Sequence, residues 1–176
     1  MTEKEEITLE NCRILLASYM EKNELTVSNI SKAIGCNSST INRIIAGTTL
    51  PTDDFIKQAG ILIVIGYEKY KKLSDSEKEN ISEKIGAVGG GVLGFGAITA
   101  AISASGTVVG LSAAGIVSGL VAIGPGGMVG GILTVAAIPI AAGAAGYGII
   151  KGIKYLISED ELNSDNIDTK WEREIF

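Results

Sequence analysis

Hydrophobic and polar residues alternate along only part of this chain. Within residues 1–84, apolar residues recur every three or four positions among polar ones, which is the spacing of amphipathic helices. From Ile85 to Ile150 the alternation disappears, because no Asp, Glu, Lys or Arg occurs in 66 residues. Charged residues return over 151–176. We therefore divide the chain into a polar head (1–73), a charged connector (74–84), an apolar middle (85–150) and an acidic tail (151–176).

Four helices and a further apolar stretch, 61–65, are predicted in the head. The first begins at 8–10 and ends at 23–24. The second follows Thr26, a good N-cap residue, and stops at Gly35, because glycine readily adopts the left-handed conformation that ends a helix. The third covers 38–45 and closes at Gly47, and the fourth begins at 51–52. In the connector, Ser74 and Glu77 have the spacing of a capping box, which predicts a helix from about residue 75 into the apolar middle.

The middle helices of the head carry a family resemblance. Leu25-Thr26, Ile30-Ser31-Lys32-Ala33-Ile34-Gly35, Ser39-Thr40-Ile41-Asn42-Arg43-Ile44, Gly47 and Pro51 follow one another at a characteristic spacing. Over about residues 11–67 this pattern resembles the lambda-repressor-like (XRE-type) helix-turn-helix domain. The resemblance implies a bundle of four or five helices in which 38–45 is the recognition helix.

The recognition helix could bind protein or DNA. Its candidate binding residues are Asn37, Ser38, Ser39, Asn42 and Arg43. Asn and Arg are good readers of base edges. However, Arg43 is the only cation on this helix, and residues 1–84 carry 11 basic and 13 acidic side chains, whereas DNA affinity comes largely from neutralising several phosphates. The sequence favours protein docking, with DNA binding and a purely structural role as alternatives.

The apolar middle is rich in small residues. It holds 18 of the 23 glycines and 14 alanines. Glycines four residues apart form a groove on one helix face, into which a neighbouring helix packs inside a membrane. The candidate packing residues with this spacing are Gly86, Gly90, Gly94, Gly106, Gly110, Gly115, Gly119, Gly126, Gly127, Gly130 and Gly131. This pattern predicts a glycine zipper within a homo-oligomer.

The length of the apolar middle predicts membrane-spanning or membrane-inserting helices. Breaks at 103–107 and 124–127 leave stretches over 85–104, 107–123 and 128–150, each near the 20 or so residues that cross a bilayer. Length indicates three crossings, whereas lysines at both ends (Lys84, Lys151 and Lys154) indicate an even number with both ends in the cytoplasm. We expect an inner-membrane protein of bacteria, or a cytoplasmic form that inserts later, without an N-terminal signal peptide. The predicted fold is all-α: a helix-turn-helix bundle followed by Gly/Ala-rich membrane helices.

No catalytic or metal-binding constellation is evident. The chain has no histidine, and its net charge is −5. Cys12 and Cys36 are isolated, so neither a zinc site nor a disulfide is indicated. We expect no enzyme activity and no cofactor. In the tail, the single tryptophan, Trp171, could anchor at a membrane interface or pack against the head, while the acidic stretch is typical of a frayed terminus.

The layout as a whole resembles bacterial abortive-infection (antiphage) effectors, in which a small recognition domain controls a membrane-disrupting segment. That resemblance implies a toxin whose head recognises a phage protein, with an oligomeric phage protein as an effective trigger because it gathers bound copies. The Gly-rich segment would then oligomerise in membrane lipids and form a pore. The alternatives are a membrane-tethered helix-turn-helix transcription regulator and a membrane assembly protein that forms no pore.

Overall fold

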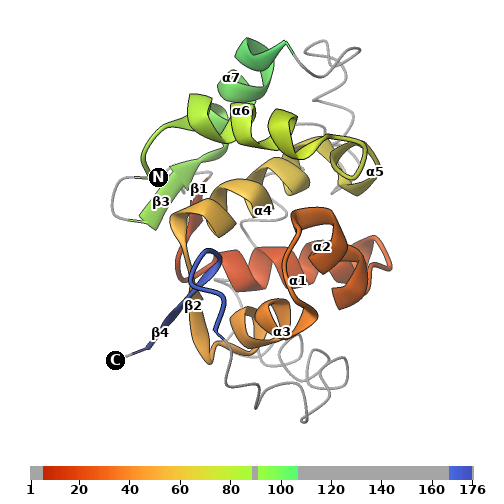
Figure 1. Cartoon of the computed structure of the whole chain (residues 1–176), viewed down its shortest axis with the longest axis vertical. Helices are drawn as coiled ribbons and strands as arrows, with labels where there is room; N and C mark the ends of the chain where they lie inside the picture. The colour runs from red at the N-terminus through yellow and green to blue at the C-terminus, as the bar shows by residue number, and fades with distance from the viewer. Residues whose placement is uncertain (1–5, 89–90, 107–166, 176) are drawn as a thin grey trace, which may run out of the picture.

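The computed structural model of this chain describes residues 6–88, 91–106 and 167–175. These residues form a mainly helical body with two small antiparallel sheets (Figure 1). The elements, in chain order, are β1 (Glu6–Thr8), α1 (Cys12–Lys22), α2 (Val27–Ile34), α3 (Ser38–Ala46), β2 (Thr49–Pro51), α4 (Asp53–Ile65), α5 (Tyr67–Tyr70), α6 (Asp75–Ile85), β3 (Val92–Gly94), α7 (Phe95–Ser105) and β4 (Glu172–Glu174). The all-α prediction therefore holds only as a mostly helical fold, because it omits the sheets.

The predicted ends of the second and third helices are confirmed. The Thr26 hydroxyl accepts a hydrogen bond from the Asn29 N–H, and the Asn29 side chain accepts one from the Thr26 N–H, so the two residues close a reciprocal capping box at the start of α2. Gly35 ends α2 with φ +85°, and Gly47 ends α3 with φ +77°. Helices α2 and α3 then pack on each other, and α3 packs on α1.

Helix α4 is the central element of the body (Figure 1). Thr52 caps its N-terminus, since the Thr52 hydroxyl accepts a hydrogen bond from the Phe55 N–H. From Phe55 to Ile65 every residue except Lys57 is buried, and α4 contacts α1, α5, α6 and α7. A helix that is apolar on nearly all sides requires neighbours on all sides. The predicted fourth helix and the apolar stretch 61–65 thus form one continuous core helix.

Helix α6 lies against α4 and is tied to it by polar contacts. The predicted capping box at Ser74 and Glu77 is confirmed. The Tyr70 hydroxyl donates to Gln58 Oε1 over 2.6 Å, Gln58 Nε2 donates to the Lys78 carbonyl, and Lys78 Nζ donates to the Ala33 carbonyl over 2.7 Å. These bonds join α2, α4 and α6 around the end of α5.

The prediction that residues 85–104 form one membrane-crossing helix is wrong. Helix α6 ends at Ile85, and Gly86 (φ +76°) turns the chain. Residues 92–94 then form β3, which pairs antiparallel with β1 so that Ile7 faces Leu93. The chain next folds back as α7, which spans 11 residues and packs against α4 and α6. One face of α7 is buried in the core of the body, where Ile98 and Ile102 lie, while the opposite face is exposed and carries small uncharged residues.

The glycine spacing in this stretch does not form a helix groove. Gly86 lies in a turn, Gly94 precedes the first turn of α7, and Gly106 ends α7 in the left-handed conformation. The other candidate packing glycines (Gly90, Gly110, Gly115, Gly119, Gly126, Gly127, Gly130 and Gly131) lie outside the described residues, as do the stretches 107–123 and 128–150.

The wider membrane interpretation is also corrected. Among the described helices, none combines the length and the apolar composition that crossing a bilayer requires. This finding contradicts the predicted transmembrane character and pore formation, and with them the predicted inner-membrane location and membrane insertion.

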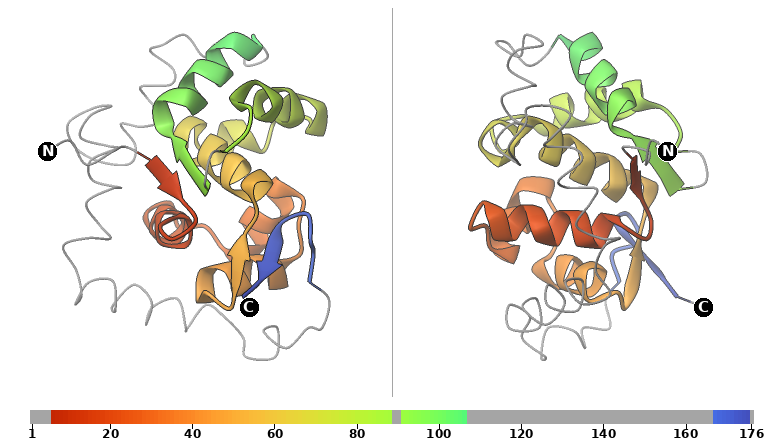
Figure 2. Two further views of the ribbon diagram at one scale, coloured as in Figure 1. Left: turned by 90° about the vertical axis from the view of Figure 1, so that its left-hand side faces the viewer. Right: turned by 180° about the vertical axis from the view of Figure 1, so that it is seen from behind.

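The end of the chain returns to the head. Strand β4 pairs antiparallel with β2, with Leu50 opposite Arg173. Figure 2 shows these two strands side by side beside α3. Trp171 is 6% exposed and belongs to the same hydrophobic core as the helices of the head. Of the two alternatives for Trp171, packing against the head is the one found, and residues 167–175 are not a frayed terminus.

Candidate functional site

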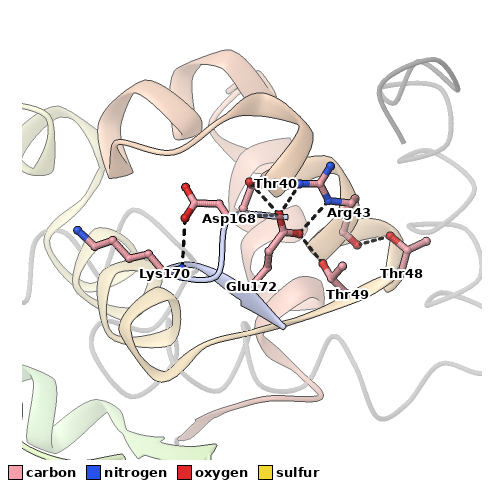
Figure 3. A network of polar contacts seen from close by, with 7 residues as sticks. All are labelled: Thr40, Arg43, Thr48, Thr49, Asp168, Lys170 and Glu172. Carbon is pink, nitrogen blue, oxygen red and sulfur yellow. Dashed lines mark hydrogen bonds and ion pairs between the residues drawn. The ribbon is translucent and has the colours of Figure 1, made fainter. Parts of the chain in front are cut away.

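The predicted binding residues fall into two groups. Asn37 is exposed, and Ser38 and Ser39 are half-buried, at the N-terminal end of α3. Asn42 and Arg43, the two residues best suited to reading bases, are only 1% and 4% exposed. The segment Asp168–Glu174, here called the C-terminal segment, lies against α3 and β2 and engages Arg43 (Figure 3). We take this contact as the candidate functional site.

The C-terminal segment combines a turn with a short strand. The N–H groups of Trp171 and Glu172 both donate to the Asp168 carbonyl over 2.9 Å, and the Lys170 N–H donates to Asp168 Oδ1. These bonds shape the turn from within the segment itself. The strand β4 that follows pairs with β2 from Pro51–Glu172 to Thr49–Glu174. The turn places the Trp171 and Glu172 side chains inward at consecutive positions.

The Glu172 carboxylate is the centre of the contact (Figure 3). It is fully buried, and its two oxygens accept hydrogen bonds from four residues. Oε2 accepts from Arg43 Nε over 2.9 Å and from the Thr49 hydroxyl over 2.8 Å. Oε1 accepts from Arg43 Nη2, the Thr40 hydroxyl and the Asp168 N–H. The guanidinium therefore grips the carboxylate with two parallel bonds, the strongest arrangement of this ion pair.

The electrostatics of the pair favour its charged form. Burial raises the pKa of Glu172, but the hydrogen bonds from Arg43, Thr49 and the Asp168 N–H, with the positive charge of Arg43, outweigh burial and leave this pKa below its ordinary value. The hydrogen bond to Glu172 raises the pKa of Arg43. Breaking a buried ion pair by removing one partner typically costs about 3–5 kcal/mol.

Thr52 connects the C-terminal segment to the start of α4. Its hydroxyl donates to the Lys170 carbonyl over 2.6 Å while accepting from the Phe55 N–H, and its backbone N–H donates to the Trp171 carbonyl over 3.0 Å. One side chain thus caps a core helix and binds the segment. At the rim, Arg173 and Asp53 form an ion pair of 3.1 Å, with both side chains about half exposed, so its contribution is small.

Cys36 lies in the turn between α2 and α3, where carboxylates of the C-terminal segment affect the pKa of its thiol. Burial, with smaller contributions from the carboxylates of Asp168 and Glu172, raises the pKa of the Cys36 thiol to about 12. A thiol with such a pKa is protonated near neutral pH and is a poor nucleophile. Within the described ranges, no three His, Cys, Asp or Glu side chains gather in a way that could hold a metal ion.

Sequence reasoning missed most of this site. It selected Arg43 but not Glu172, Thr40, Thr49 or Thr52. Arg43 and Glu172 are 129 residues apart, so no local spacing links them. The available signal was the combination of Trp171 with Glu172, a large aromatic beside an acid, in a stretch otherwise typical of a solvated terminus.

The chain was compared with protein-family models, with curated proteins and with solved structures, and none of the three comparisons found a match.

Proposed function

We propose that this chain is a non-enzymatic protein-recognition module, whose helix-turn-helix head binds polypeptide along α3 and β2 and does not read DNA. The observation that carries the proposal is the seating of Glu172 on Arg43. Arg43, the cation of α3 best suited to reading bases, is held by a carboxylate of the C-terminal segment instead.

The charge of the head supports this proposal. A helix that reads bases needs an arginine or asparagine free to reach the major groove, and phosphate binding needs several cations nearby. Helix α3 carries one cation, Arg43, and it is paired with Glu172. The acidic balance of residues 1–84 also repels a polyanion.

The proposal retains one part of the antiphage-effector hypothesis, namely that the head recognises a phage protein. It does not require insertion into a membrane. It also replaces the hypothesis of a tethered transcription regulator, because that role requires α3 to contact DNA.

The test uses the full-length chain and two measurements. Fluorescence anisotropy with labelled duplex DNA at low salt reports DNA binding, and the emission of Trp171, the only tryptophan, reports seating of the C-terminal segment. We expect no DNA binding and the short-wavelength emission of a buried indole. Arg43→Met should move the emission to longer wavelength and create no DNA affinity.

Lys32→Met is the matched control, because it removes an exposed cation of α2 and leaves the segment in place. Its emission should equal that of the unmodified chain. Salt-sensitive DNA binding that Arg43→Met abolishes and Lys32→Met retains would overturn the proposal.

A further inference from the structure

The contacts of the C-terminal segment define the chemistry of the surface that it covers on α3, β2 and the start of α4, which we call the groove. We infer that this groove is a docking site for a partner protein that presents an exposed turn–strand segment with an aromatic residue directly before a glutamate. In the absence of the partner, the chain's own C-terminal segment occupies the groove, and the partner displaces it. This inference rests on the proposed function, since it names the kind of partner that the head binds.

Recognition is confined to a short segment. In the part of the chain that the structure describes, the hydrogen bonds and ion pairs of the C-terminal segment with the head come from residues 170–174, and Asp168 shapes the turn from within. A partner therefore needs one exposed strand to make the same contacts. Strand addition to the edge of a sheet, with pockets for particular side chains, is a recurring mode of peptide recognition.

The specificity of the groove comes from side chains and not from the backbone. The backbone pairing with β2 and the bonds from Thr52 reach carbonyl groups that every polypeptide has. Selection falls to the two inward side chains: the indole of Trp171 in the core and the carboxylate of Glu172 on Arg43, Thr40 and Thr49. A strand without the acid forfeits the two hydrogen bonds from the Arg43 guanidinium and those from the Thr40 and Thr49 hydroxyls, which weakens its binding. The groove thus selects an acidic, aromatic strand.

A partner has to compete with the chain's own C-terminal segment for the groove. Covalent attachment gives the C-terminal segment an effective concentration of up to roughly the mM range. A monovalent rival at μM concentration does not displace it, whereas a tighter or multivalent partner does. The groove therefore selects among partner proteins by their valency as well as by their sequence.

The experiment supplies the segment separately. The full-length chain with Trp171→Ala and Glu172→Ala has no tryptophan and no acid to seat on Arg43. A synthetic peptide with the sequence of residues 167–176 is the probe, and its tryptophan is then the only one present. We expect saturable binding with a shift of its emission to shorter wavelength. The unmodified chain should bind the same peptide at least about tenfold more weakly, because its groove is occupied.

Two substitutions test the acid. A peptide with glutamine in place of Glu172 should bind at least about tenfold more weakly, and so should the original peptide on a chain that also carries Arg43→Met. Combining the two changes should add little, since each removes the same pair. Lys32→Met in the same background is the control and should leave the affinity unchanged.

If the doubly substituted chain loses the circular dichroism of its helices, Glu172→Gln, which conserves side-chain size, takes its place, and a dye-labelled peptide is followed by anisotropy. A folded chain that does not bind the peptide overturns this inference. The proposed function then survives if the unmodified chain has a buried Trp171 and no DNA affinity. Equal binding of the glutamine peptide also overturns the inference. Displacement of the peptide by duplex DNA overturns both, because it makes Arg43 a phosphate-binding residue.

Discussion

Ile98 of α7 lies directly over Gly60 of α4. A Cβ atom at position 60 would come within 2.5 Å of Ile98 Cδ1, closer than two carbon atoms can approach. The missing side chain of Gly60 is thus what lets α7 pack onto the central helix, and this contact holds the apolar stretch after residue 94 in the body.

A double-mutant cycle tests that contact. Gly60→Ala gains about 1 kcal/mol of helix propensity but overpacks the contact by about 1–3 kcal/mol, so we expect net destabilisation. Ile98→Val alone costs about 0.5–1.5 kcal/mol. Valine lacks the clashing methyl group, so the two changes should partly compensate each other. The loss of unfolding free energy in the double variant, measured by urea unfolding, should be smaller than the sum of the two single losses by at least about 0.5 kcal/mol.

Gly96→Ala is the control for this cycle. Gly96 lies in α7, and no neighbouring part of the described chain comes within 4 Å of the position of its Cβ. This change should stabilise the chain by up to about 1 kcal/mol. Strict additivity of Gly60→Ala and Ile98→Val would contradict the packing that we describe.

The Arg43–Glu172 pair predicts an acid transition. The pKa of Glu172 is lower in the folded chain than its ordinary value, so ionisation of Glu172 favours the folded form. This stabilisation is complete above the pKa of the unfolded chain, about 4.3, and is lost as the pH falls through the lower folded-state pKa. Trp171 emission should therefore move to longer wavelength below about pH 4. The chain with Glu172→Gln should lack this component, and an identical acid transition in both chains would exclude Glu172 as its source.

Thr52 should show both of its roles when substituted. Thr52→Ala removes the N-cap of α4, at a cost of about 0.5–2 kcal/mol, and also the hydrogen bond to the Lys170 carbonyl. We expect a lower melting temperature together with a red shift of Trp171 emission, and Thr52→Ser should restore both. Thr26→Ala removes a cap of α2 far from the segment, so it should lower stability without changing the emission. An unchanged emission in Thr52→Ala would show that the segment does not depend on this residue.

The two cysteines should report the segment differently. Burial raises the pKa of Cys12 to about 12, and the pKa of Cys36 is raised to a similar value by burial and by carboxylates of the C-terminal segment. In the unmodified chain both should react slowly with iodoacetamide. Arg43→Met should accelerate alkylation of Cys36 and not of Cys12, as followed by mass spectrometry. Equal acceleration at both sites would indicate general unfolding instead.

The sequence predicted what is set within a few residues. The caps at Thr26 and Ser74 and the glycine stops at Gly35 and Gly47 depend on contacts three or four positions away, so spacing reveals them. The start of the fourth helix was predicted at 51–52, but the role of Thr52 as its cap was not. The resemblance to a helix-turn-helix domain and the functions drawn from it stay predictions.

The failures involve contacts between distant segments. Nothing local shows that α7 packs on Gly60, so the uncharged stretch predicts self-packing, membrane-inserting helices instead. Each strand is only three residues long and finds its partner far along the chain, which leaves no hairpin signal. The ion pair of Arg43 with Glu172 likewise depends on the folded topology.

The pairing of β2 with β4 has a topological consequence. The Thr49 hydroxyl and the Glu172 carboxylate bond across 123 positions of sequence, so this pairing fixes two distant segments in one body. Bringing such distant positions together costs roughly 4 kcal/mol of chain entropy, which the strand pairing and the burial of Trp171 and Glu172 must offset jointly. Because that entropy is lost only once, loss of the Glu172 contact should release β4 and Trp171 together and not one after the other.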